Sequence, residues 1–313
     1  MLLASGLLLT FVFSASASYT EKLARSVCTL LFDGKIPADT QAADFDADSS
    51  VYDNENVLGQ NQTWADIIEF PDVSSSLVYS STVVMKKDSL WTNIDVTLSC
   101  CRSLISLNRF SDESIFAPGG QLQSGFRRSE LIPAINDGTD ITVQGTTTVH
   151  WSLRSDSSKP FNLSHEYQLV FHETSDFSTS QFMLKTGAPF GQTFVESEHK
   201  TLRLEGRQTT SATLFSTPFD DDVWHNFAVT VAWNSTSITV FYSKNSDSLS
   251  LANVTSNDNS GQGQQHFGIL KLPTGDAGID VAHEGFQESG LNEGLIYGGI
   301  FIEDSSDGCI TLS

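Results

Sequence analysis

Apolar and polar residues alternate over short stretches along most of the chain, and Gly, Asn, Asp, Ser or Pro separates one stretch from the next. Such stretches, rich in Val, Ile, Phe, Thr and Tyr, are typical of β-strands. We find no amphipathic helical period longer than two turns. The pattern predicts an all-β fold, a β-jelly-roll sandwich of two curved antiparallel sheets with a concave substrate groove. The stretches are CTLLFDGKIP, SSLVYSSTVVM, NIDVTLS, TSQFMLKTG, KTLRLEG, TTSATLFST, HNFAVTVAWN, SITVFYS, FGILKLP and EGLIYGGIFIE.

Three further segments between residues 125 and 173 combine an apolar face with a charged one: GFRRSEL, VHWSLR and HEYQLVFH. Because successive side chains of a strand point to opposite faces, Glu130 lies opposite Leu131, and Glu166 lies opposite Tyr167. If the three strands pair in one sheet, their polar faces form one surface that carries two carboxylates. The other polar residues expected on this surface are Arg128, His150, Arg154, Gln168 and His172.

Two carboxylates on one surface point to glycoside hydrolysis. That reaction needs an acid for the leaving oxygen and a second carboxylate that activates water or attacks the sugar. The alternative is that Glu130 and Glu166 are ordinary solvent-facing glutamates. The Arg, His and Gln donors on the same face favour a sugar-binding surface. Neighbouring strands would place the pair about 5 Å apart, as in retaining enzymes, and strands two apart about 10 Å, as in inverting enzymes.

Gln181 and His225, on later predicted strands, are further candidates for sugar contacts. His225 shares its strand face with the apolar Phe227 and Val229. A buried, hydrogen-bonded histidine is therefore the default interpretation, and a groove-lining role is the alternative. Trp151 alternates with apolar residues and is expected in the core.

The first 17 residues form an apolar run that ends in small residues, a pattern typical of a signal peptide. The run is too short to span a membrane. Four Asn-X-Ser/Thr sequons agree with this secretory route. We therefore expect a secreted, extracellular glycoprotein without membrane association, in which residues 18–313 form a single catalytic domain. The sequons begin at Asn61, Asn162, Asn234 and Asn253.

The chain contains 17 Lys and Arg residues and 38 Asp and Glu residues, which gives a net charge of −21. Nucleic acid is a poor partner for such a chain, because no basic stripe is present to neutralise phosphates. A neutral polysaccharide is compatible with the charge. We expect no metal and no other cofactor, and a monomer. The acidic residues near the C-terminus, Glu303 to Asp307, would at most indicate an oxygen-ligand calcium site. A solvated acidic surface is the preferred interpretation.

The four cysteines fit a secreted chain. Cys28 and Cys309 lie near the two ends of the mature protein, and a disulfide between them would tie these ends together in an oxidising compartment. Cys100 and Cys101 are adjacent, which is awkward for a shared disulfide, and their spacing fits no zinc pattern.

Several longer motifs resemble the catalytic domain of fungal glycoside hydrolase family 131, over nearly the whole mature chain. The motifs are SDESIFAPGG, GFRRSELIPA, HWSLR, LSHEYQLVFHE, STPFDDDVWHNFAVTV, NDNSGQGQQHFGILKLPTG and GLNEGLIYGGIFIEDSSDGC. The resemblance implies a secreted jelly-roll enzyme that hydrolyses β-1,3, β-1,6 and β-1,4 linkages of β-glucans. It also implies two catalytic glutamates, which by motif are Glu130 and Glu166, and an inverting outcome.

The chain departs from the family pattern between residues 99 and 111, where CCRSLISLNRF intervenes. We interpret this segment as an insertion. The sequence also ends without a cellulose-binding module, so tight anchoring to crystalline cellulose is less expected. Two other functions compete with hydrolysis: a polysaccharide lyase on the same fold, and a non-catalytic, lectin-like glucan-binding module.

Overall fold

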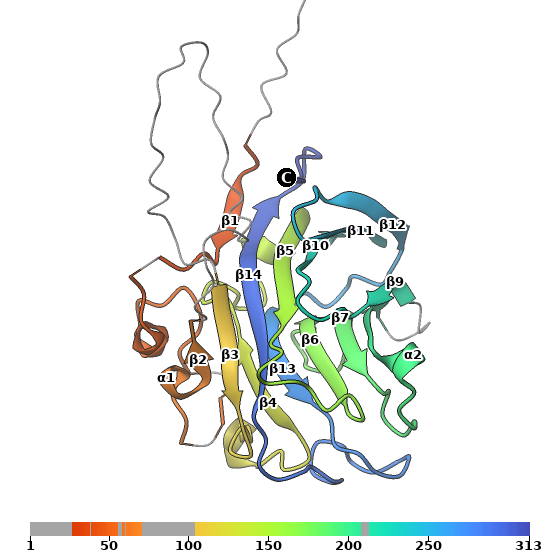
Figure 1. Cartoon of the computed structure of the whole chain (residues 1–313). Coiled ribbons are helices and arrows are strands. Elements are labelled where there is room, and N and C mark those ends of the chain that lie inside the picture. The colour runs from red at the N-terminus through yellow and green to blue at the C-terminus, as the bar shows by residue number, and fades with distance from the viewer. Residues whose placement is uncertain (1–26, 38, 56–57, 60, 71–103, 208–212) are drawn as a thin grey trace, which may run out of the picture.

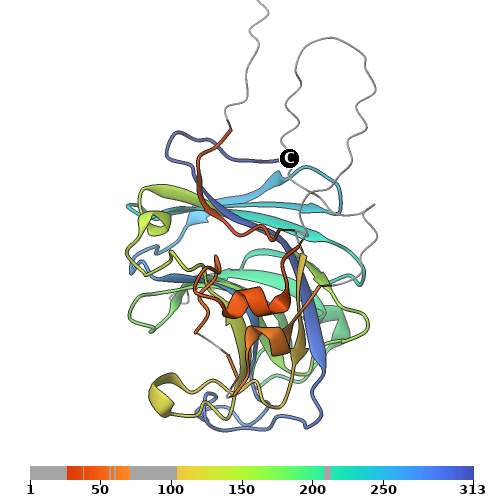
Figure 2. The same cartoon turned by 90° about the vertical axis from the view of Figure 1, so that its left-hand side faces the viewer.

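Two antiparallel β-sheets packed face to face make up most of the molecule (Figure 1). The computed structural model describes residues 27–37, 39–55, 58–59, 61–70, 104–207 and 213–313. Figure 2 shows the two layers, with short helical segments on the side where β2 and β3 lie. The predicted all-β sandwich is thereby confirmed. The expected signal peptide and the expected strands at 75–85 and 93–99 lie outside the described residues.

The larger sheet has eight strands within the described residues, in the order β12-β11-β10-β5-β14-β3-β2, with β1 also pairing to β14. We call it the eight-stranded sheet. Its strands are β1 (Leu30–Asp33), β2 (Ile68–Glu69), β3 (Leu104–Phe110), β5 (Thr146–Ser155), β10 (His225–Ala232), β11 (Ser237–Lys244), β12 (Ser250–Ser256) and β14 (Glu293–Asp304).

The smaller sheet, called the six-stranded sheet, has the order β4-β13-β6-β7-β8-β9. Its strands are β4 (Arg127–Leu131), β6 (Glu166–Glu173), β7 (Ser180–Gly187), β8 (Thr201–Gly206), β9 (Thr213–Pro218) and β13 (Gln264–Lys271). The described helices are all shorter than six residues. They are η1 (Ala42–Asp46), α1 (Trp64–Ile67), η2 (Pro118–Gly120), η3 (Ile141–Val143) and α2 (Glu196–His199).

The core lies between the sheets and is rich in aromatic rings. Trp151 of β5 stacks on Phe227 of β10, with ring centroids 5.2 Å apart. The ring centroid of Phe182, on the opposite sheet, lies 6.3 Å from that of Trp151. All three side chains are nearly fully buried. The core position of Trp151, predicted from the alternation in β5, is therefore confirmed. Burial of such side chains contributes about 1.5–3 kcal/mol each to stability.

Residues 104–110, which belong to the segment interpreted as an insertion, form strand β3. This strand pairs with β14 on one side and with β2 on the other. The described part of the segment is therefore built into the sheet and does not form an irregular loop.

Both ends of the described chain meet at one edge of the sandwich. Cys28 and Cys309 form a disulfide bond with Cα atoms 5.5 Å apart, next to the pairing of β1 with β14. Such a bond restricts the unfolded chain, because it closes a loop of 281 residues. No helix among the described residues is long and apolar enough to cross a membrane.

Candidate active site

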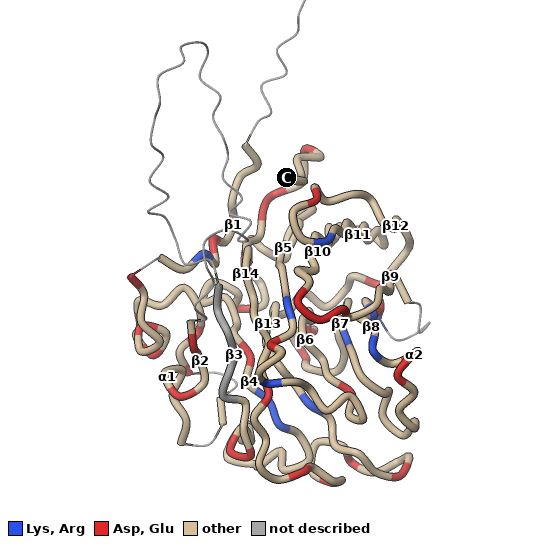
Figure 3. The backbone as a smooth tube through the Cα atoms, viewed as in Figure 1, with Lys and Arg blue, Asp and Glu red and all other residues tan. Residues whose placement is uncertain are grey.

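A row of charged side chains crosses the face of the six-stranded sheet that points away from the core. The alternation in β4 and β13 explains it, because Leu131, Phe267 and Ile269 enter the core while their neighbours face outward. Figure 3 marks the positions of basic residues along β7 and β8. The row consists of Arg128, Glu130, His266, Glu173, Lys185, Glu166, Arg203 and Glu205, with the uncharged Gln168 among them.

Arg128 and Glu130 form a buried ion pair at one end of the row. The guanidinium donates from Nε to Oε1 at 2.8 Å and from Nη2 to Oε2 at 2.7 Å, and the Glu130 side chain is 0% exposed. Burial alone would favour the neutral acid. The positive charges of Arg128 and His266 outweigh this effect and lower the pKa of Glu130. Glu130 is therefore held as a carboxylate.

His266 connects Glu130 to a third acidic residue. Its Nδ1 lies 2.8 Å from Oε2 of Glu130, and its Nε2 lies 3.6 Å from Oε2 of Glu173. The imidazole stacks on Phe171 at 4.4 Å, which fixes the plane of the ring. Because one imidazole lies between the two carboxyl groups, their facing oxygens are at most roughly 9 Å apart, and the ring occupies the space between them.

Gly268 provides the room for this arrangement. It pairs with Glu130 across β4 and β13. A Cβ at this position would collide with the carbonyl oxygen of Ser129 and would lie 2.7 Å from Cγ of Glu130. The glycine therefore allows the carboxylate to turn toward Arg128 and His266.

Glu173, the last residue of β6, is the member of this group that reaches solvent, with 24% of its side chain exposed. Burial raises its pKa, and the positive charges of His266 and Arg128 reduce this shift only in part. Glu173 lines a cavity of about 260 Å³ together with Gln168, Met183 and Glu205. The environments of Glu130 and Glu173 thus move their pKa values in opposite directions, as in acid and base pairs of hydrolases.

Comparison with known proteins now identifies the fold and the family. The family model described as the glycoside hydrolase 131 catalytic N-terminal domain matches residues 30–308. The chain belongs to glycoside hydrolase family 131.

Two solved structures of this family share the architecture. A GH131 β-glucanase catalytic domain from Podospora anserina aligns with a TM-score of 0.55 and 21% identity, over 91% of this chain and 98% of that chain. The catalytic domain of a family 131 protein from Coprinopsis cinerea aligns with a TM-score of 0.57 and 18% identity, over 91% and 97%. A search among curated proteins finds no match. The family match and the two similar structures identify the chain as a glycoside hydrolase domain with the family 131 fold.

Glu166, the second glutamate expected from the sequence, lies on the same outer face in this family 131 domain, at the other end of β6. Its Oε1 is 3.0 Å from Nζ of Lys185, and its Oε2 accepts a hydrogen bond from the backbone N–H of Phe190 at 3.0 Å. Only 8% of the side chain is exposed. Lys185 also pairs with Glu205 at 3.1 Å. Both oxygens of Glu166 are therefore engaged within the protein.

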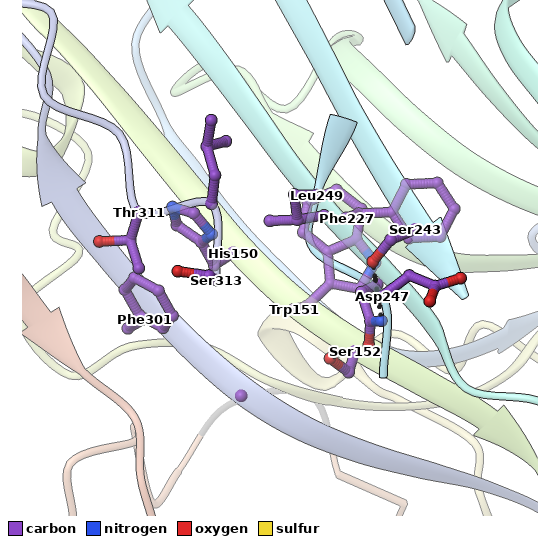
Figure 4. Close-up of a pocket in the computed structure, with 13 residues that line it drawn as sticks. His150, Trp151, Ser152, Phe227, Ser243, Asp247, Leu249, Phe301, Thr311 and Ser313 are labelled. Atoms are coloured by element: carbon purple, nitrogen blue, oxygen red, sulfur yellow. Dashed lines mark hydrogen bonds between the residues drawn. The ribbon is translucent and has the colours of Figure 1, made fainter. Parts of the chain in front are cut away.

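His150 and Arg154 do not join this surface, and the expectation that β5 would pair with β4 and β6 is wrong. β5 belongs to the eight-stranded sheet, so its polar face points away from the carboxylates. There His150 contacts Glu303 at 2.9 Å, and Arg154 contacts Asp222 at 2.6 Å. Figure 4 shows His150 beside Phe301, at a separate cavity of about 80 Å³ that the C-terminal residues also line.

His172 lies on the core side of its strand, contrary to the expected alternation. A β-bulge between Gln168 and Val170 shifts the register by one residue. Phe171 and Glu173 consequently occupy the outer face, and the His172 ring lies 4.8 Å from Trp233 between the sheets. Burial lowers the pKa of His172 to about 3, so this histidine is neutral.

Gln181 and His225 lie away from the carboxylates and make hydrogen bonds inside the protein. Gln181 donates from Nε2 to the carbonyl oxygens of Ser260 and Gln262, at 3.0 and 2.7 Å, and is fully buried. His225 lies on the core face of β10, where Nδ1 is 2.9 Å from the Tyr242 hydroxyl. Burial lowers the pKa of His225 to about 4. The default interpretation of His225 as a buried histidine agrees with this position.

The four sequon asparagines differ in their exposure to solvent. Asn61, Asn162 and Asn234 are exposed, whereas Asn253 is half-buried and donates from Nδ2 to the Leu214 carbonyl at 2.8 Å.

Among the residues that the structure describes, no group of three or more His, Cys, Asp or Glu side chains is arranged to hold a metal ion. Glu303 accepts hydrogen bonds from the N–H and the hydroxyl of Thr311 and contacts His150.

Sequence reasoning missed His266 and Glu173. The signal for His266 was its place in QQHFGIL, where it alternates with the apolar Phe267 and Ile269. Glu173 was not considered, and a strict period of two would place it on the core face, because that period does not include the bulge.

Proposed function

We propose that this domain is a secreted β-glucan hydrolase that acts on β-1,3, β-1,6 and β-1,4 linkages with inversion, as a monomer. Family membership supports glycoside hydrolysis, and the similar Podospora domain is a β-glucanase. The single observation that carries the proposal is the carboxylate pair around His266. Glu173 has a raised pKa and faces a cavity, while Glu130 has a lowered pKa behind it.

In this proposal Glu173 is the general acid, which protonates the leaving glycosidic oxygen. Glu130 remains ionised, and it orients His266 through the contact at Nδ1 so that Nε2 is directed toward Glu173. A water molecule that attacks the anomeric carbon would lose its proton to Nε2 of His266 in its neutral form, and the Glu130 carboxylate at Nδ1 would stabilise the imidazolium that forms. Glu130 and Glu166 form the competing pair, on the basis of the family resemblance and their common face.

One assay tests the proposed function. The purified protein is incubated with laminarin, a linear β-1,6-glucan and a mixed-linkage β-glucan, and NMR follows the anomeric configuration of the first products. We expect oligosaccharides whose new reducing ends are initially α, as inversion requires. Products that absorb in the ultraviolet would instead identify a lyase, and retention on insoluble glucan without released reducing sugar would identify a binding module.

The dependence of kcat/KM on pH should be bell-shaped. Glu173 must be protonated to act as an acid, so activity falls as the pH rises through its pKa, which lies above the ordinary value of 4.5. Glu130 must be ionised, so activity falls again below its lowered pKa. Initial rates on laminarin across the acidic range give both limbs. A rate that keeps increasing above neutral pH would contradict the role of Glu173.

A further inference from the structure

Phe177 stands out beside the cavity because its ring is exposed and its backbone is strained. It lies in the loop between β6 and β7, with 68% of the residue exposed and a φ of 58°. Left-handed backbone is unfavourable for a bulky aromatic residue. The other non-glycine residues with positive φ in the described parts of the chain are Asn61, Asp222, Asn245 and Gln262.

The loop that carries Phe177 is held firmly in place. Asp176 accepts hydrogen bonds from the hydroxyls of Thr174 and Ser178, at 2.6 and 2.8 Å, and the Phe177 N–H donates to the Thr174 carbonyl at 2.8 Å. Ser175 donates from both its N–H and its hydroxyl to the carbonyl of Gly261. These bonds offset the strain and hold the backbone at Phe177 in place.

The ring and the proposed acid line the same cavity. Glu173 lies four residues before Phe177, and the cavity wall also includes Gln168, Met183 and Glu205. Within the part of the chain that the structure describes, Phe177 takes part in none of the aromatic contacts that fill the core. The ring is therefore free to pack against a ligand.

We propose that Phe177 is the stacking platform of a glucosyl-binding subsite next to Glu173; this deepens the proposed function and rests on it. In a β-linked glucose ring the hydroxyls are equatorial, so each face of the sugar presents C–H groups. Such a face packs on an aromatic ring while Gln168 and Glu205 offer hydrogen bonds at the cavity wall. The structure thus assigns Phe177 to substrate binding and not to the chemical step.

The test compares Phe177→Ala, Phe177→Asn and Phe177→Trp with the wild type. Asparagine removes the ring but tolerates left-handed backbone, so that variant should fold at least as well as the wild type. We expect KM for laminarin oligosaccharides to rise about three- to tenfold in the Ala and Asn variants, with kcat within twofold. The Trp variant should keep the wild-type KM. Leu251→Ala, on β12 of the other sheet, is the control for loss of an exposed apolar side chain.

Migration in gels that contain laminarin measures binding without catalysis. The wild type should be retarded, and the Ala and Asn variants should be less so. If the wild type hydrolyses glucan and the variants keep its KM and retardation, the subsite is wrong and the proposed function stands. If the wild type hydrolyses no glucan but is retarded through Phe177, the hydrolytic proposal fails and the subsite stands. Absence of retardation of the wild type in every glucan gel overturns the subsite.

Discussion

Glu173→Gln should lower kcat on laminarin by about 10²- to 10⁴-fold, because glutamine has the shape of the acid but no proton to give to the leaving oxygen. The side chain is partly exposed and its contact with His266 is long, at 3.6 Å. The melting temperature should therefore change little. Initial rates together with thermal unfolding of the same preparation provide the measurement.

An activated substrate separates loss of the acid from loss of binding. A dinitrophenyl β-glucoside needs no protonation of its leaving group, so Glu173→Gln should retain much more of its activity on this substrate than on laminarin. Glu205→Gln is the matched comparison, because Glu205 lines the same cavity with a similar exposed fraction of 23% and is assigned to binding: its loss should affect both substrates alike and give no selective rescue. If Glu166→Gln shows the selective rescue and Glu173→Gln does not, the acid is Glu166.

Glu130→Gln should abolish most activity and also destabilise the protein by about 3–5 kcal/mol. The variant leaves the buried Arg128 guanidinium without its counter-charge, and an uncompensated buried charge is costly. Loss of the carboxylate also removes the charged partner of His266 Nδ1. Chemical denaturation and initial rates on laminarin measure the two effects. Glu166→Gln should destabilise less, because Lys185 keeps its contact with Glu205.

A double variant distinguishes a structural role of Glu130 from a functional one. In Arg128→Met/Glu130→Leu both charges are replaced by apolar side chains of similar volume, and stability should return toward that of the wild type. Activity should stay low, because His266 then lacks the group that orients it. Recovery of activity together with stability would show that Glu130 serves only to hold the fold.

The faces of individual strands were predictable from local pattern. The alternation in GFRRSEL placed Arg128 and Glu130 together and opposite Leu131, and the structure has them so. Trp151 and the default position of His225 follow from the same rule. The rule works because the side-chain period of two is a property of the extended backbone itself.

The choice of sheet was not predictable in this way. VHWSLR and GFRRSEL show similar patterns, yet β5 lies in the eight-stranded sheet and β4 in the six-stranded sheet. Pairing partners depend on contacts between residues far apart in the chain, such as β5 with β14. A local pattern carries no information on such partners, and this is why His150 and Arg154 were assigned to the wrong surface.

By itself the amino-acid sequence determined the strand content, the membership in a glycoside hydrolase family and the outward face of β4. The tertiary structure alone decided which charged residues meet. One bulge in β6 reverses the faces beyond Gln168, so that Glu173 points outward and His172 inward. β13, almost 140 residues after β4, brings His266 beside Glu130. The physical reason is that alternation acts between neighbours along the chain, whereas register and strand order depend on packing across the whole sandwich.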